Sequence, residues 1–351
     1  MKFRVLIALL ALTLIAAACG NDTDISPTVT GDTAEDTADE AMEDDEEAME
    51  DEESEEAMED DAMEDEEVGT ADADAGGDAG PDANAAAAIA ESDEAQTIVS
   101  LSPTATEILF AIGAGDSVVA VDAFSNFPAE APVSELSGFE PNVEAIAEFE
   151  PTVVYSQSPI EGLDALGIQN IVQPAAASID DVYAQIEQSG AETGNVGEAA
   201  ELVLQMQTDI DAILAALPER ETPLTYYHEI DTTFFTSTSS TFIGQVYALL
   251  GLENIADPAD PDGEAFGFPQ LSQEFIVDAN PDIIFLADTI FEAQTAETVA
   301  ARPGWDQLSA VQNGNVIEMN DDIASRWGPR IVEFLQVAGD AVSAIEAVPA
   351  S

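Results

Sequence analysis

The sequence predicts an α/β protein with two equivalent lobes joined by one long helix. From Thr97 onward, short apolar runs that suit buried strands alternate with stretches of helical periodicity. A unit of helix, proline and strand occurs twice in this region, and the longest helical stretch, about Val196 to Leu217, falls between the two copies. A chain of 351 residues is long enough for two lobes of ordinary domain size.

The candidate strands are short and apolar, and glycine and proline separate them from the helical stretches. They are Thr97–Leu101, Val118–Val121, Val153–Tyr155, Leu224–Tyr227, Ile283–Leu286 and Val316–Met319. The long helix carries apolar residues at three- and four-residue steps, and Pro218 ends it. Ser178 followed by Asp181 has the capping-box pattern, which predicts the start of a preceding helix.

An internal repeat is the evidence for two lobes. The segment Glu144–Tyr155 (EAIAEFEPTVVY) aligns without gaps with Glu274–Phe285 (EFIVDANPDIIF). A weaker similarity links Ser102–Gly113 with Ser240–Gly251. Two such lobes joined by one helix form a cleft, which is a common place for a ligand.

The composition excludes several classes of function. The chain has 73 Asp and Glu against 6 Lys and Arg, with a formal net charge of -67, so it lacks the basic surface that binds nucleic acid. One cysteine and one histidine exclude an internal disulfide, a Cys-rich zinc site and a His-rich metal site. A Ser/His/Asp triad could use only His228, and its place in or beside a strand with Tyr227 favours a structural role.

The N-terminus has the pattern of a secretory signal, residues 1–19. Lys2 and Arg4 precede the apolar run Val5–Ile15, and small residues lead to Cys19. Cys19 lies where a bacterial lipoprotein signal carries its lipidated cysteine, and the segment resembles such a lipobox. We therefore expect a protein held on the extracytoplasmic face of the cell membrane by lipid on Cys19. The alternative is an ordinary signal peptide with an incidental cysteine.

Residues 20–96 have the composition of an extended, disordered tether. They contain an imperfect Ala-Met-Glu-Asp repeat and no aromatic residue, so they cannot bury enough apolar surface to fold. Repulsion between the carboxylates extends the segment. A calcium-binding tail is the alternative, but the segment has no glycine-punctuated Asp loop of the kind that wraps the ion.

Two kinds of residue are candidates for ligand contact. Ser102, Pro103 and Thr104 follow a strand and open a helix, whose free N–H groups would face the cleft; Thr238–Thr241 is the equivalent place in the second lobe. Aromatic residues also gather in loops flanked by glycine and proline, which favours ligand contact over core packing. They are Phe124, Phe127, Phe234, Phe235, Phe266 and Phe268.

Asp322 and Arg326 form a further candidate pair near the C-terminus. One interpretation is a surface ion pair of little energetic value. The other is a pair that faces the cleft and orients a polar edge of the ligand, because Trp327-Gly328-Pro329 follows directly.

Several segments together resemble the Fe/B12 periplasmic-binding domain family, with its cobalamin-binding branch the nearest. They are Ile98–Pro128, Gly138–Val154, Phe234–Ile255, Phe268–Ser272 and Ser325–Leu335, and the resemblance covers Gln96 to about Ala344. It implies the class III solute-binding architecture, with two Rossmann-like lobes joined by a single long rigid helix. The domain would cover 97–346, with lobes at about 97–177 and 219–346 and bridging helices at about 178–218.

The family resemblance implies a role in an ABC importer, with permease and ATPase subunits as partners and no enzymatic activity. It implies ligand contacts at Phe127, Phe235, Phe268, Asp322 and Arg326. It also implies that Glu144 and Glu274, the residues paired by the repeat, dock onto arginines of the permease.

The resemblance identifies the family more specifically than it identifies the ligand. Gly138 and Gln157 occupy places where cobalamin binders carry tryptophan against the corrin ring. A corrinoid is the first expectation, with haem and a ferric siderophore as alternatives, each as cargo; no cofactor or metal of the protein's own is expected. A surface lipoprotein with an adhesive or structural role is the alternative from another class.

Overall fold

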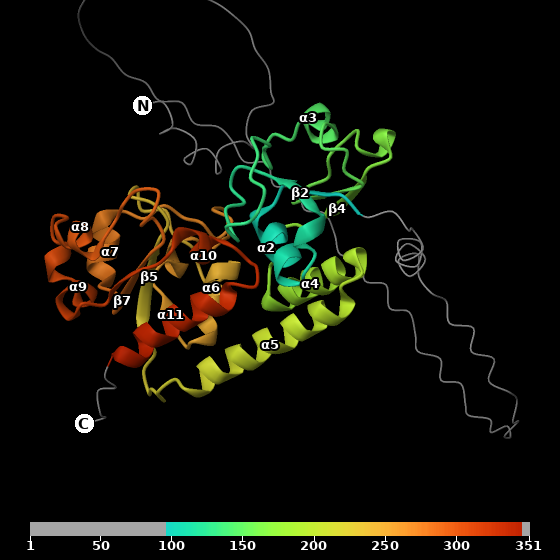
Figure 1. Ribbon diagram of the computed structural model, residues 1–351. Helices are drawn as coiled ribbons and strands as arrows, with labels where there is room; N and C mark the ends of the chain where they lie inside the picture. The colour runs from blue at the N-terminus through green and yellow to red at the C-terminus, as the bar shows by residue number, and fades with distance from the viewer. Residues whose placement is uncertain (1–95, 346–351) are drawn as a thin grey trace, which may run out of the picture. The chain divides into compact units, whose positions relative to one another are not determined.

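The computed structural model describes residues 96–345, which form two four-stranded parallel sheets with helices packed around them (Figure 1). The predicted signal peptide, Cys19 and the tether up to residue 95 lie outside the described residues. The first sheet has the order β2-β1-β3-β4 and the second β6-β5-β7-β8. The strands are β1 Ile98–Ser100, β2 Val118–Val121, β3 Val153–Ser156, β4 Gln169–Val172, β5 Thr225–Glu229, β6 Glu253–Asn254, β7 Ile283–Leu286 and β8 Val316–Glu318.

Helices lie between most of these parallel strands, because neighbouring parallel strands need a crossover connection. They are α2 Pro103–Ala111, α3 Val143–Ala147, α4 Ile179–Thr193, α5 Val196–Ala215, α6 Phe242–Leu249, α7 Gln273–Ala279, α8 Ala296–Ala300, α9 Ser309–Asn313, α10 Asp321–Ser325 and α11 Ile331–Ala344. None of the described helices is long and apolar enough to cross a membrane.

The two lobes repeat one another in detail, which confirms the duplication predicted from the sequence. Asn142 caps α3 by accepting from Ala145 N, and Ser272 caps α7 in the same way. After these helices the backbone turns at Glu150 (φ 50°) and Asn280 (φ 48°), both in the left-handed region. The strands that follow occupy the same position in each sheet: β3 pairs with β1, and β7 pairs with β5.

All six predicted strands are present within a residue or two of their expected bounds. The prediction missed β4 and β6, because neither is an apolar run. β4 has the sequence QNIV and buries only Ile171, and β6 is two residues long. Both lie at the edge of a sheet, where half-exposed strands carry polar residues.

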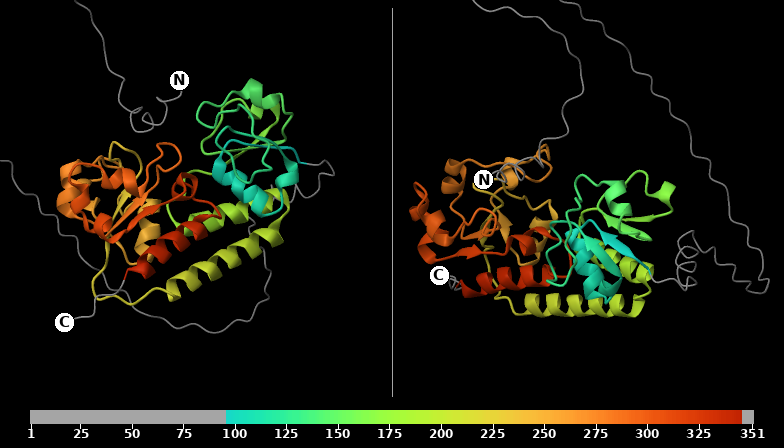
Figure 2. Two further views of the ribbon diagram at one scale, coloured as in Figure 1. Left: turned by 60° about the vertical axis from the view of Figure 1, so that its left-hand side comes forward. Right: turned by 45° about the horizontal axis from the view of Figure 1, so that its top comes forward.

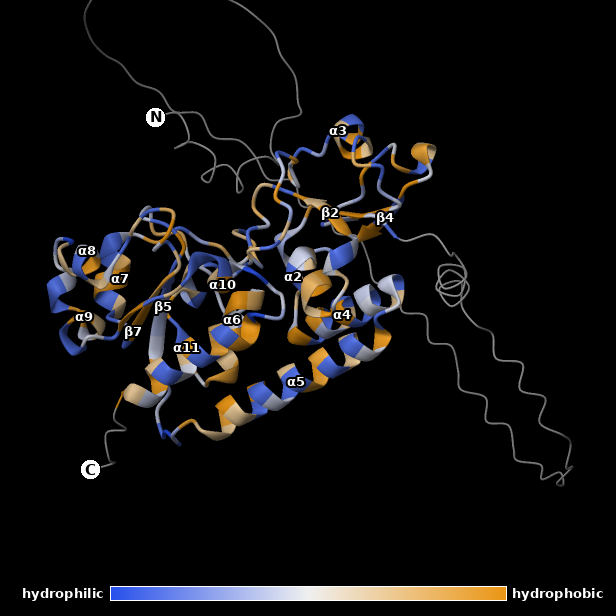
Figure 3. Ribbon diagram, in the orientation of Figure 1, coloured by the Kyte–Doolittle hydropathy of each residue, from blue (hydrophilic) through white to orange (hydrophobic). Residues whose placement is uncertain are grey.

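Two antiparallel helices, α4 and α5, connect the first sheet to the second. Ser178 and Asp181 form the predicted capping box at the start of α4. The buried face of α5 carries Val203 and Met206, and Figure 3 shows its alternating hydrophobic and hydrophilic bands. In Figures 1 and 2, α11 lies alongside α5, with which it is in contact. One continuous apolar core joins Ile98 of β1, Met206 of α5 and Phe285 of β7, so these elements stabilise each other.

Candidate ligand-binding site

A polar cluster joins the two lobes through Arg326. Its Nη1 donates to Glu107 Oε1 at 2.7 Å, and its Nη2 donates to Asp322 Oδ1 at 2.7 Å. Nη2 also donates to Asn126 Oδ1 and to the Phe124 carbonyl, both at 3.0 Å. Asn126 Nδ2 in turn donates to Asp322 Oδ2 at 2.9 Å. Glu107 lies on α2 and Arg326 follows α10, so residues about two hundred positions apart in sequence meet here.

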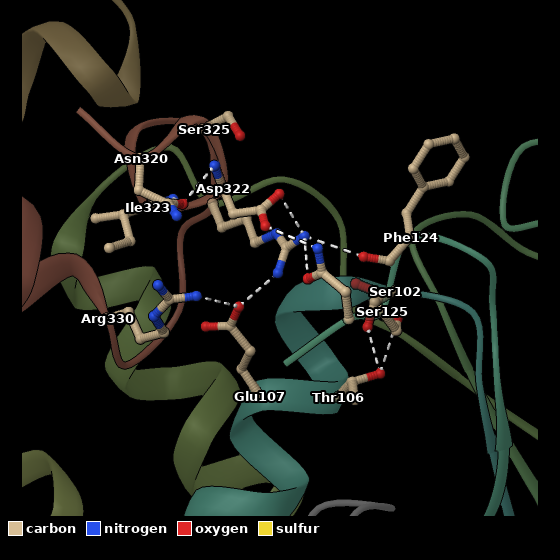
Figure 4. Close-up of polar contacts among 12 residues, drawn as sticks. Ser102, Thr106, Glu107, Phe124, Ser125, Asn320, Asp322, Ile323, Ser325 and Arg330 are labelled. Atoms are coloured by element: carbon tan, nitrogen blue, oxygen red, sulfur yellow. Dashed lines mark hydrogen bonds and ion pairs between the residues drawn. The ribbon is translucent and has the colours of Figure 1, made fainter. Parts of the chain in front are cut away.

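A second arginine reinforces this interlobe cluster. Arg330 Nη1 lies 3.5 Å from Glu107 Oε1, and its Nε lies 3.4 Å from Glu333 Oε1. The Arg330 guanidinium also stacks over the Phe127 ring, 4.2 Å from its centroid. Figure 4 shows Arg330 facing Glu107, while the Phe124 ring points away from the ion pairs. The predicted Asp322–Arg326 pair is therefore part of a larger network and not an isolated surface pair.

Glu107 is the buried centre of the cluster. The residue is 3% exposed, and in the part of the chain that the structure describes its Oε2 has no hydrogen-bond partner. Burial raises the pKa of Glu107, and hydrogen bonding and charge attraction from Arg326 and Arg330 oppose that rise. The two arginines thus compensate a carboxylate that would otherwise be costly to bury.

Hydroxyl groups beneath the cluster fix its first-lobe side. Thr106 Oγ1 lies 2.9 Å from Ser100 Oγ and 3.0 Å from Ser125 Oγ, within hydrogen-bond distance of both, and Ser125 Oγ donates to Asp122 Oδ1 at 2.5 Å. Burial raises the pKa of Asp122, against the hydrogen bonds from Ser125. This series of hydrogen bonds holds the loop that carries Asn126 in place.

The helix start predicted at Ser102 is present, but its side chains are mostly covered. Ser102 caps α2 by accepting from Ala105 N at 3.3 Å, and Pro103 is the first helical residue. Ser102 and Thr104 are 2% and 3% exposed, so the cap and the packing are the roles the structure shows. Ligand contact by these three residues stays a prediction. On the second lobe, Thr238 and Thr241 are also buried.

Most of the predicted aromatic contact residues do lie at the surface. Phe124, Phe127 and Phe268 are 40%, 43% and 42% exposed, and Phe266 is 87% exposed. Phe235 is half-buried and forms an isolated bridge with Gln270. Large aromatic side chains that gather at an exposed surface are typical of a binding site.

Phe139 is an aromatic residue that the sequence reasoning missed. It is 60% exposed and meets Phe124 edge to face, with centroids 5.7 Å apart. Its neighbour Gly138 has no room for a side chain, because an added Cβ would lie 2.4 Å from the Leu101 carbonyl oxygen. In this loop, therefore, Phe139 can present an aromatic ring, whereas position 138 can hold only glycine.

A separate buried ion pair lies within the second lobe. Arg302 donates from two nitrogens to Glu229, at 2.6 and 2.5 Å, and Glu229 is fully buried. The Arg302 guanidinium also lies 4.5 Å from the Trp305 ring centroid. Burial, together with the neighbouring Glu229 carboxylate, raises the pKa of Asp288 to about 8. We infer that Asp288 is largely protonated at neutral pH.

His228 has the structural role expected from the sequence. It is 1% exposed, and its Nδ1 lies 2.9 Å from the hydroxyl oxygen of Tyr247. Burial lowers the pKa of His228 to about 4, so the ring is neutral near pH 7. No group of three metal-binding side chains is found among residues 96–345.

Glu144 and Glu274 occupy equivalent exposed positions in the first turns of α3 and α7. Their role in docking stays a prediction.

Two hollows of the described region lie apart from the interlobe cluster. One, of about 630 Å³, runs between α5 and α11, and the other, of about 280 Å³, lies beside Pro174–Ala177 and α4.

Comparison with known proteins agrees with this architecture. A cobalamin-binding protein of Halobacterium salinarum is 32% identical over 267 residues, covering 72% of this chain and 70% of the relative. An ABC transporter substrate-binding lipoprotein of Bacillus subtilis is 29% identical over 262 residues, covering 71% and 80%. The crystal structure of the periplasmic vitamin B12 binding protein of Vibrio cholerae superposes with a TM-score of 0.56 and 25% identity, covering 70% of this chain and 96% of that one. The periplasmic heme binding protein of the same organism gives 0.63 and 23%, covering 70% and 98%.

The model of the periplasmic binding protein family matches residues 98–323, which includes both sheets and reaches the start of the interlobe cluster on α10. The chain therefore belongs to the periplasmic binding protein family, whose members are substrate-binding proteins of ABC transporters and not enzymes.

Proposed function

We propose that this protein is a lipid-anchored, extracytoplasmic binding protein that captures a corrinoid at the lobe junction and delivers it to an ABC importer. The observation that carries the proposal is the set of exposed aromatic residues beside the interlobe cluster. Phe124 and Phe139 form an edge-to-face pair, and Phe127 lies under Arg330. Such rings suit the face of a large, flat ligand, and the polar cluster suits its polar edge.

The relatives favour a corrinoid over the alternatives. The protein of Halobacterium salinarum is named for cobalamin and those of Pectobacterium and Yersinia for vitamin B12. Structural neighbours named for haem and for Fe3+-hydroxamate transport keep haem and a ferric siderophore as second candidates. The exposed ring of Phe139 supplies an aromatic surface where Gly138 has none, which supports the first candidate.

Delivery would use the two equivalent glutamates. Glu144 and Glu274 lie on repeated units of the two lobes, and both side chains are exposed. Neither belongs to the interlobe cluster, so docking and ligand capture are separable. We propose that each glutamate pairs with arginines of the permease and that lipid on Cys19 keeps the protein at the membrane.

The identity of the ligand is tested by native mass spectrometry of the protein purified from its own host. The proposal expects a bound corrinoid, released on unfolding. A bound haem or siderophore would replace the corrinoid assignment with the corresponding alternative. Protein that is purified without a ligand is then titrated with each of the three, and failure to bind any of them would refute ligand capture of this kind.

A further inference from the structure

The arginines of the described region are already engaged. Arg326 and Arg330 contact Glu107, and Arg302 contacts Glu229. Arg220 donates to the backbone carbonyls of Val342 and Ile345 at the end of α11. Lysine is absent after Lys2, and His228 is neutral near pH 7. Every arginine among residues 96–345 therefore already has a carboxylate or carbonyl partner, and Arg330 is the most weakly held, with contacts at 3.4 and 3.5 Å.

Arg326 cannot take up a ligand carboxylate without loss. Its two terminal nitrogens donate to four acceptors, two of which are carboxylates. An incoming anion would have to displace Glu107 or Asp322 from the guanidinium. Glu107 is buried and already has one oxygen without a partner, so displacing it would leave a poorly compensated charge in the protein.

The groups left over at the junction are hydrogen-bond acceptors. Asp322, at 16% side-chain exposure, is the acceptor that a ligand can reach, whereas Glu107 Oε2 has no partner among the described residues but is buried beneath the cluster. Amide N–H and hydroxyl groups of a ligand complement acceptors of this kind, whereas a carboxylate adds like charge. The formal net charge of -67 adds a repulsive field for anions approaching from solution.

We propose that the lobe junction selects ligands by charge: it admits neutral or cationic ligands rich in hydrogen-bond donors and rejects ligands with ionised carboxylates or catecholates. Glu107 is the specificity-determining residue, because its carboxylate contacts both junction arginines. This inference rests on the proposed function only in placing the ligand at the lobe junction. The peripheral amides of a corrinoid satisfy the selection rule, whereas the propionates of haem do not.

The test uses ligand pairs that differ in charge and little in shape. Cyanocobalamin is compared with the monocarboxylic acid made by hydrolysing one peripheral amide, and a neutral ferric trihydroxamate with an anionic ferric tricatecholate. Wild-type protein should prefer the neutral member of a bound pair by about tenfold or more at neutral pH, because like charges brought together cost several kcal/mol. Equal or tighter binding of the anion would overturn the selection rule.

The variant Glu107→Gln assigns the selection to this residue. It keeps an acceptor for Arg326 and removes the negative charge, so affinity for the anionic member should rise and the preference should fall by about fivefold or more. Exposed Glu187 on α4 provides the matched control, since Glu187→Gln makes the same change in net charge and should leave the preference unaltered. Equal weakening of both members by Glu107→Gln would show a structural role only and refute the assignment.

The outcomes separate this inference from the proposed function. If neither corrinoid binds but the trihydroxamate binds much more tightly than the tricatecholate, the corrinoid assignment fails and the charge selection stands. If both corrinoids bind equally well, the corrinoid assignment stands and the charge selection fails.

Discussion

Replacing Arg326 with leucine should destabilise the ligand-free protein strongly, because it strands Glu107. The Glu107 side chain is 2% exposed and the Arg326 side chain 10%, so the pair is largely removed from water. Removing one partner of a buried pair costs about 3–5 kcal/mol. Arg330 stays 3.5 Å from the same carboxylate oxygen, which places the expected loss near the lower limit, about 3 kcal/mol.

The double variant Glu107→Leu, Arg326→Leu should be far less damaging than the sum of the two single variants. Apolar residues that replace both members of a buried pair are often neutral or stabilising. Arg330 keeps Glu333 at 3.4 Å in this variant, and Asp322, which loses its ion pair with Arg326, is partly exposed and keeps the hydrogen bond from Asn126. We expect a coupling energy of about 2–3 kcal/mol between the two positions.

Urea unfolding of the mature protein at neutral pH measures these energies, with the slope of the transition reported for each variant. Glu333→Gln is the control, because the Glu333 side chain is 55% exposed and its loss should cost under about 1 kcal/mol. A loss below about 1 kcal/mol for Arg326→Leu would place this pair among ordinary surface pairs. Such a small loss would also contradict the conclusion that Glu107 is a buried charge stabilised by Arg326 and Arg330.

Four further predictions concern the rest of the chain. Glu144→Ala with Glu274→Ala should abolish uptake and ATPase stimulation in a reconstituted importer while ligand titration stays normal; wild-type transport would contradict the docking role. Cys19→Ser should release the protein into soluble fractions or leave the precursor uncleaved, and a normally processed, membrane-bound variant would contradict lipid attachment. Deletion of residues 21–96 should leave ligand affinity within about twofold, whereas a tenfold loss, about 1.4 kcal/mol, would give the tether a part in binding. Because the folded-state pKa of Asp288 is raised to about 8, its contribution to stability is largest below the unfolded-state pKa of about 3.9, falls as pH rises from there to about 8, and is constant above it. Asp288→Asn should therefore gain stability relative to wild type between about pH 5 and pH 8, by about 3–4 kcal/mol in urea unfolding, and parallel pH profiles would contradict the raised pKa.

The fold was predictable because its signals are local. The strands β2 and β7 are apolar runs with sharp ends, and their bounds agree with the prediction. The capping box at Ser178 needs only four consecutive residues to be recognised. The duplication was visible because both copies keep the same helix, proline and strand. The edge strands β4 and β6 were missed because they are short and carry mostly polar residues, which leave no apolar pattern.

The candidate site was only partly predictable, because its contacts are distant in sequence. Asp322 and Arg326 are one helical turn apart, so their pairing could be proposed. Glu107 is 219 residues from Arg326, and in a chain this acidic no pattern distinguishes it from other carboxylates. Phe139 was missed because its neighbour Gly138 was compared with the family's tryptophan, and only the backbone contact at Leu101 shows that no side chain fits there.

The central claim, capture of a corrinoid at the lobe junction, is tested most directly by isothermal titration of the ligand-free protein with cyanocobalamin, followed in parallel by tryptophan emission. Trp305 is fully buried and Trp327, next to Arg326, is partly buried, so a change in emission lost in Trp327→Phe reports on the junction. The account predicts saturable binding of one corrinoid per chain with this Trp327-dependent change. Absence of corrinoid binding by protein that does bind haem would contradict it.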